Sequence, residues 1–106
     1  MKFVQVLTTT PDKETAEKIA KTLVENKLAA CVQIYGPVTS VYRWKDKIEQ
    51  EVEWQCQIKT CDKLTDKIEN LIKDAHPYDV PEIIVTEIVS GSNEYLNWIK
   101  EMVAIG

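Results

Sequence analysis

The order in which hydrophobic periodicity changes along this chain restricts the fold more than any other feature. Between residues 52 and 59 apolar and polar side chains alternate, which is the period of a half-buried β-strand. Residues 16–24 and 64–75 instead place apolar side chains three and four positions apart, the stripe of an amphipathic helix. Further extended segments are expected at residues 3–8, 30–35, 39–44 and 82–89.

Helix boundaries follow from residues with capping or helix-breaking chemistry. Thr10 followed by Pro11 predicts the start of the first helix, because a hydroxyl can cap it and the proline ring fixes a helical φ. Asp62 is the expected cap of the second helix, which His76 and the proline after it should end. Ser92 predicts the start of a third helix, whose inward side chains are expected to be Leu96, Ile99 and Val103.

The segments between the helices predict a long β-hairpin. Residues 45–47 form its polar tip, and Gly36-Pro37 should produce a bulge or bend in the first arm. The resulting order, βαββαβ plus a C-terminal helix, is the ferredoxin-like split βαβ arrangement of an α/β (α+β) protein. With 106 residues, the chain is expected to be a single domain spanning 1–106.

One face of the predicted sheet lacks the charges expected of a surface in water. It carries neutral amides and apolar or aromatic side chains, namely Gln5, Gln33, Gln55, Gln57, Phe3, Leu7 and Tyr35. Such a mixture suits a half-dry contact, so we expect the chain to self-associate. The alternative is that the C-terminal helix alone covers this face.

Charge and cysteine content exclude several classes of partner. The net charge is −4, Arg43 is the only arginine and no polybasic run occurs, so nucleic acid and anionic membranes are not expected partners. No signal peptide or membrane span is indicated. The odd count of three cysteines, Cys31, Cys56 and Cys61, argues against a disulfide framework and for reduced thiols in a cytosol.

The loop at residues 76–82 contains the densest group of reactive side chains. Two prolines stiffen it and hold an imidazole, a phenol and two carboxylates, which could bind copper, zinc or nickel. The alternative is a helix stop with a surface histidine that forms local hydrogen bonds. No set of nucleophile, base and orienting group can be named, so a binding protein is expected and not an enzyme.

A second group of side chains is aromatic. Tyr42, Trp44 and Trp54 lie along the predicted hairpin. Cross-strand packing is the simpler explanation for them, and a ligand cage is the alternative.

Five motifs in the same order give the chain a resemblance to a known family. They are Leu28-Ala29-Ala30-Cys31, Tyr42-x-Trp44, Ile58-Lys59-Thr60, His76-Pro77-Tyr78-x-x-Pro81-Glu82 and Tyr95-Leu96-x-Trp98-Ile99. Together they resemble the CutA divalent-cation-tolerance family from about residue 3 to about residue 102.

The resemblance implies a cytoplasmic homotrimer with the architecture of the PII regulatory proteins. It also implies binding of divalent cations, Cu²⁺ above all, without an organic cofactor. By position, His76 and Glu82 match the metal-binding motif of the family. Thr8 stands where some members have a cysteine near the first helix, and Ala75 where some have a second histidine, so a tight copper site is weakened here.

Two other functions are compatible with the same strand order. A PII-like signalling trimer would bind a small anionic ligand or a partner protein in its inter-subunit cleft near Trp44, Lys59 and Tyr78, where the lysine supplies the positive charge. An RNA-recognition module would need a basic surface and aromatic residues where Gln5, Gln55 and Gln57 stand, so with a net charge of −4 it is not expected.

Overall fold

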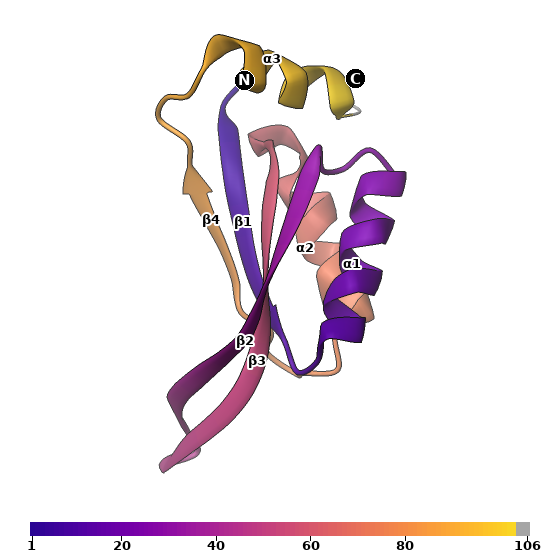
Figure 1. Ribbon diagram of the computed structural model, residues 1–106. Coiled ribbons are helices and arrows are strands. Elements are labelled where there is room, and N and C mark those ends of the chain that lie inside the picture. The colour runs from indigo at the N-terminus through magenta and orange to yellow at the C-terminus, as the bar shows by residue number, and fades with distance from the viewer. Residues whose placement is uncertain (104–106) are drawn as a thin grey trace.

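A computed structural model describes residues 1–103 of the chain (Figure 1). The elements are β1 (Phe3–Thr10), α1 (Lys13–Glu25), β2 (Cys31–Trp44), β3 (Lys47–Cys61), a 3₁₀ turn (Asp62–Leu64), α2 (Thr65–Ala75), β4 (Ile83–Glu87) and α3 (Asn93–Met102). The strands form one antiparallel sheet in the order β2-β3-β1-β4. This is the predicted ferredoxin-like order, with α1 and α2 on one side of the sheet and α3 across the end where β1 begins.

The core lies between α1, α2 and the helix-facing side of the sheet. Alternate residues of β1 and β3 point into it, including Val6, Cys56 and Ile58. The helix stripes supply Leu23 and Ile68 among others, and all of these side chains are buried. The predicted periodicities of two and 3.6 therefore identified most of the core, although Val24, Val52 and Ala75 of the predicted stripes are exposed.

The starts of the first two helices differ from the prediction. Thr10 is the last residue of β1, and the cap of α1 is Asp12, whose Oδ1 accepts a hydrogen bond from Thr15 N at 2.7 Å. Asp62 opens the 3₁₀ turn, and α2 begins three residues later. The Asp62 carboxylate instead accepts from the backbone N–H of Lys2 at 3.0 Å, because β1 and β3 pair up to this point.

The other helix boundaries agree with the sequence. α2 ends at Ala75, and His76 adopts the extended conformation that a following proline favours. Ser92 caps α3 by accepting from Tyr95 N at 3.2 Å. Ile99 and Val103 are buried, whereas Leu96 is half-buried. The last strand is shorter than predicted, Ile83–Glu87 instead of 82–89.

The β2–β3 hairpin extends well beyond the helices (Figure 1). Its register shifts between Tyr35 and Val38, which confirms the predicted irregularity at Gly36-Pro37. At the tip, Lys45 and Asp46 both have positive φ (48° and 66°), as a two-residue hairpin turn requires. Three apolar side chains on one face of the projecting part stay exposed: Val41 at 63%, Ile48 at 63% and Val52 at 58%.

The open face of the sheet is only partly covered by α3. Ile99 is fully buried, yet Gln33 remains exposed, and so do Tyr35 and Ile84. The alternative drawn from the sequence, that the C-terminal helix alone covers this face, is therefore wrong.

Trp54 packs against the core where the hairpin leaves the globular part. It is half-buried, its ring centroid lies 5.6 Å from Lys13 Nζ, and the ring also lies close to Gly36. A Cβ atom on Gly36 would lie 2.3 Å from Trp54 Cε3 and 2.5 Å from Trp54 Cδ2. Glycine is therefore required there by the indole ring.

Gly36→Ala should lower the free energy of unfolding by about 1–3 kcal/mol, the usual cost of overpacking a filled site. Gly91→Ala is the matched control, since its Cβ would lie at an ordinary 3.4 Å from the Leu96 side chain. That control should stay within about 0.5 kcal/mol of wild type in urea unfolding. Equal stabilities for the two variants would show that the indole does not occupy this position.

Candidate functional site

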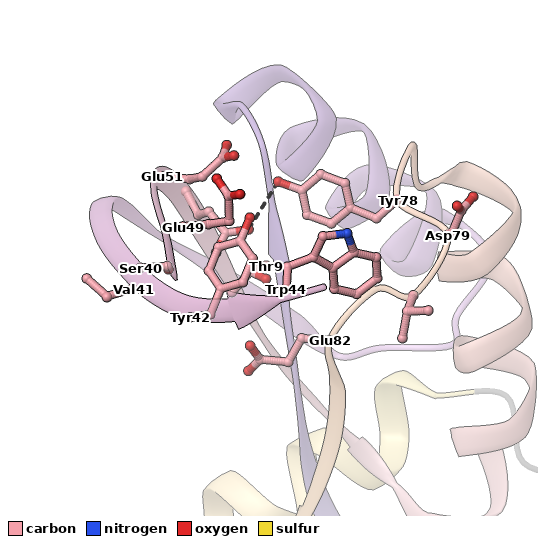
Figure 2. A pocket seen from close by; sticks show the side chains of 12 residues that line it. Thr9, Ser40, Val41, Tyr42, Trp44, Glu49, Glu51, Tyr78, Asp79 and Glu82 are labelled. Atoms are coloured by element: carbon pink, nitrogen blue, oxygen red, sulfur yellow. Dashed lines mark hydrogen bonds between the residues drawn. The ribbon is translucent and has the colours of Figure 1, made fainter. Parts of the chain in front are cut away.

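A cleft of about 750 Å³ lies between the β2–β3 hairpin and the loop that follows α2 (Figure 2). Its lining residues are Thr9, Ser40, Val41, Tyr42, Trp44, Glu49, Glu51, Glu53, Tyr78, Asp79, Val80 and Glu82. We call it the acidic cleft, because five of these side chains are carboxylates and none is basic.

Strand pairing explains how one wall forms. Successive side chains of a strand point to opposite faces, so Glu49, Glu51 and Glu53 share one face of β3. Tyr42 pairs with Glu49, and Ser40 pairs with Glu51, which places them on the same face of the hairpin. The exposed apolar side chains at the hairpin end belong to the opposite face.

The other wall is positioned by His76. This side chain is 8% exposed, and its Nε2 lies 2.6 Å from the carbonyl oxygen of Thr9. Its Nδ1 lies 3.1 Å from the backbone N of Tyr78. A backbone N–H can only donate and a carbonyl can only accept, so the imidazole is neutral with its proton on Nε2.

Tyr78 connects the two walls. Its hydroxyl donates to Glu53 Oε2 at 3.2 Å, and its ring centroid is 4.7 Å from that of His76. Partial burial raises the pKa of Tyr78 to about 12, and the Glu53 carboxylate adds to the effect. Glu53 itself is only 7% exposed.

The aromatic side chains lie between groups of carboxylates. In Figure 2 the Tyr42 and Trp44 rings are placed between the Glu49–Glu51 wall and Glu82. Desolvation raises the pKa of Tyr42, and the charges of Glu51 and Glu49 raise it further. The electrostatic potential of the cleft is therefore negative.

The structure brings some of the predicted site residues together and separates others. Trp44, Tyr78 and Glu82 line the cleft, and His76 lies behind its wall. Lys59 is absent from the lining, pairs with Gln5 of β1 and donates to Gln33 Oε1 at 2.9 Å. Without this lysine, an anionic ligand is not favoured in the cleft of a single chain.

The predicted metal ligands are not arranged as a chelate within one chain. No group of three or more His, Cys, Asp or Glu side chains within residues 1–103 is placed to hold a metal ion. Both ring nitrogens of His76 already make hydrogen bonds, so coordination would require one of these bonds to break. Its role as a metal ligand stays a prediction.

The two departures from the family motif lie outside the cleft lining. Thr8 is fully buried on the helix side of β1, and its hydroxyl has no hydrogen-bond partner within the described residues. Ala75 is exposed at the end of α2.

Sequence reasoning overlooked the carboxylates that dominate the site. Glu49, Glu51 and Glu53 recur at every second residue of a strand, where glutamate is an unfavourable choice. That spacing was a usable signal. Asp79 gave no such signal, because its place in the cleft depends on how the loop folds.

Comparisons with known proteins agree on one family. A sequence model described as CutA1 divalent ion tolerance protein matches residues 4–102. The divalent-cation tolerance protein CutA of Thermus thermophilus is 44% identical over 91% of this chain and 93% of its own length. The crystal structure of CutA1 from Oryza sativa superposes with a TM-score of 0.96 at 36% identity, covering 100% of this chain and 97% of that one.

Other relatives differ in length or in stated location. The chain spans only 52% of human protein CutA, to which it is 37% identical over 89% of its own residues. A solved structure from Archaeoglobus fulgidus, called a periplasmic divalent cation tolerance protein, has a TM-score of 0.93 at 38% identity and covers 96% of this chain and 99% of that one. Within residues 1–103, no helix combines the length and the apolar character needed to cross a membrane.

Tyr78→Phe should make stability less sensitive to pH above 10. The folded state keeps the Tyr78 proton up to about 12, whereas an unfolded tyrosine loses it near its ordinary value of 10.0. The Tyr78 phenol therefore stabilises the folded state fully below pH 10.0, and this stabilisation is lost as pH rises toward about 12. Urea unfolding at several pH values should therefore give a shallower decline for Tyr78→Phe than for wild type.

The control for this experiment is Tyr35→Phe, which removes an exposed phenol outside the cleft. It should follow the wild-type decline. If the stability of Tyr78→Phe declines with pH as that of the wild type does, the wild-type Tyr78 hydroxyl does not lie against Glu53 in solution.

Proposed function

Because the chain belongs to the CutA1 divalent ion tolerance protein family, we propose that it binds divalent cations in the acidic cleft, as a homotrimer in the cytosol. The observation that carries the proposal is the composition of the cleft wall. Five carboxylates face a cleft without a basic side chain, so the cleft attracts cations and repels anions.

Cu²⁺ is the cation that we expect to bind most tightly. Nitrogen and oxygen sites of a given geometry generally bind Cu²⁺ more strongly than Mn²⁺ or Zn²⁺. Carboxylates alone also accept Mg²⁺ and Ca²⁺, so selectivity should be modest. Residues 1–103 of a single chain offer no ready-made chelate, which predicts micromolar or weaker affinity, on the order of 10⁻⁶ M or higher in Kd.

Three features of the surface support the trimer. The projecting hairpin exposes Val41, Ile48 and Val52 on one face, apolar side chains that association would remove from water. The outer strands β2 and β4 present unpaired edges within the described sheet. The half-covered face with Tyr35 and Ile84 offers a further contact area.

Cytosolic location is supported by the thiols. Cys31, Cys56 and Cys61 are all unpaired, and the latter two are buried. Burial raises the pKa of Cys56 to about 11, so this thiol is inert and structural. Fractionation of cells that produce the native protein tests the location, and recovery outside the cytosol would contradict it.

Light scattering should give a mass of about three times 12.2 kDa, unchanged by reducing agents. Val52→Glu should lower the mass at micromolar concentration, because it places a charge on the apolar face of the hairpin. Val89→Glu is the control, since this side chain is 89% exposed and lies outside the strands. A wild-type monomer would refute the proposed assembly.

Calorimetry with CuCl₂ tests the cation site. Glu82→Gln should weaken Cu²⁺ binding by about two- to fivefold, as the loss of one exposed charge interaction predicts. Glu17→Gln removes an exposed carboxylate of α1 outside the cleft and should leave the isotherm unchanged. Identical isotherms for the two variants would exclude the cleft as the site.

The variant His76→Ala tests whether the His76 imidazole, inferred from the family motif, coordinates Cu²⁺. If the imidazole coordinates Cu²⁺, this variant should abolish most binding. An unchanged isotherm would show that the cation is bound by the carboxylates without the imidazole. The variant should also be less stable by about 1–3 kcal/mol, since it leaves buried hydrogen-bonding groups of Thr9 and Tyr78 unpaired.

A further inference from the structure

The loop between α2 and β4, residues 77–82, is attached to β1 at both of its ends. β4 pairs with β1 no further than Thr8, whose partner is Ile83, the first residue of β4. At the start of the loop, His76 Nε2 donates to the carbonyl oxygen of Thr9 at 2.6 Å. The two attachment points are therefore adjacent residues of the same strand, and the loop begins and ends at one place on the sheet.

Only one of these two attachments is made by a side chain. The end of the loop is held by strand pairing, whereas its start depends on the imidazole. The loop supplies Tyr78, Asp79, Val80 and Glu82 to the lining of the cleft. Without the imidazole, this wall would be held at its β4 end and by the hydrogen bond from Tyr78 to Glu53 that Figure 2 shows.

The imidazole does not fit the role of metal ligand that the family motif implies. A metal ion binds a ring nitrogen that carries no proton. Nε2 carries the proton, and the lone pair of Nδ1 accepts from the backbone N–H of Tyr78 at 3.1 Å. The side chain is 8% exposed and is not among the residues that line the cleft. Coordination at either nitrogen would therefore break a bond that holds the loop.

We propose that His76 is a positioning residue for the cleft and not a metal ligand. Its neutral imidazole fixes the start of the loop on β1 and thereby sets where Tyr78 and Glu82 face the hairpin. The effect on cation affinity rests on the proposed function, whereas the positioning of the loop does not. Groups that orient a site without touching the ion typically change its affinity by about ten- to a hundredfold.

Amide side chains separate positioning from coordination. Glutamine can donate to the Thr9 carbonyl from the place of Nε2, asparagine can accept from the Tyr78 N–H at the place of Nδ1, and alanine can do neither. Loss of binding in His76→Ala is expected for a ligand and for a positioning residue alike. An amide does not replace imidazole as a ligand of Zn²⁺, so recovery of binding in an amide variant indicates positioning.

Calorimetry with ZnCl₂ on the full chain compares these variants, after melting temperatures have shown that each is folded. His76→Ala should weaken binding by about ten- to a hundredfold. His76→Gln should recover most of that loss, because it restores the attachment to β1. His76→Asn should recover less, since its bond reaches only two residues along the chain. Equally weak binding by folded His76→Gln and His76→Ala would overturn the proposal.

Nitrogen-15 NMR of the imidazole observes coordination directly. His76 is the only histidine, so its two ring signals are unambiguous. One nitrogen should be protonated and the other not, and ZnCl₂ should leave this pattern in place, since Zn²⁺ is diamagnetic. Loss of the Nε2 proton or a large shift of Nδ1 on addition of ZnCl₂ would overturn the proposal.

Hydrogen exchange at the Tyr78 backbone amide reports on the loop without any cation. This N–H donates to His76 Nδ1, so it should exchange slowly in wild type and in His76→Asn, and faster in His76→Ala. Equal exchange rates in wild type and His76→Ala would contradict the positioning role. If the wild type binds no ZnCl₂, the proposed cation function fails, and the exchange rates still decide whether His76 positions the loop.

Discussion

The buried imidazole of His76 holds together the parts that form the cleft. One nitrogen is bonded to the carbonyl of Thr9 at the end of β1, and the other accepts from the backbone of Tyr78. These two bonds join the loop after α2 to the sheet across 67 residues of sequence. With the loop fixed there, Tyr78 can reach Glu53 on the hairpin. The histidine therefore acts as a structural support for the site, whatever further role it has with metal ions.

The cleft concentrates negative charge in a way that opposes folding. Like charges two residues apart on one strand face repel each other, and Glu53 loses most of its hydration as well. The Tyr78 hydroxyl offsets part of this cost at one oxygen. A cation bound in the cleft, as proposed, would relieve the remaining cost. An arrangement that destabilises the empty protein and favours a bound cation is typical of a binding site.

The two faces of the projecting hairpin carry different kinds of side chain. One face carries the glutamates and Tyr42, and the other exposes Val41, Ile48 and Val52. Period-two alternation alone produces this division, and a register slip of one residue would exchange the two faces. The register shift near Gly36 and the tight turn at Lys45-Asp46 set the pairing. The proposed cation binding and the proposed self-association therefore depend on largely different faces of the hairpin, although Val41 also lines the cleft.

The sequence by itself determined the element order, most of the core stripes, the end of α2 and the start of α3. These depend on local periodicity and on residues such as Pro77 and Ser92. It also determined the family, through motifs that are short and contiguous. It failed where distant segments decide the outcome. Asp62 accepts a hydrogen bond from Lys2. Lys59 donates to Gln33 outside the cleft, and Glu53 is buried and accepts from Tyr78. Those contacts join residues 25 to 60 positions apart, and only the packed sheet and loop bring such residues within hydrogen-bonding distance.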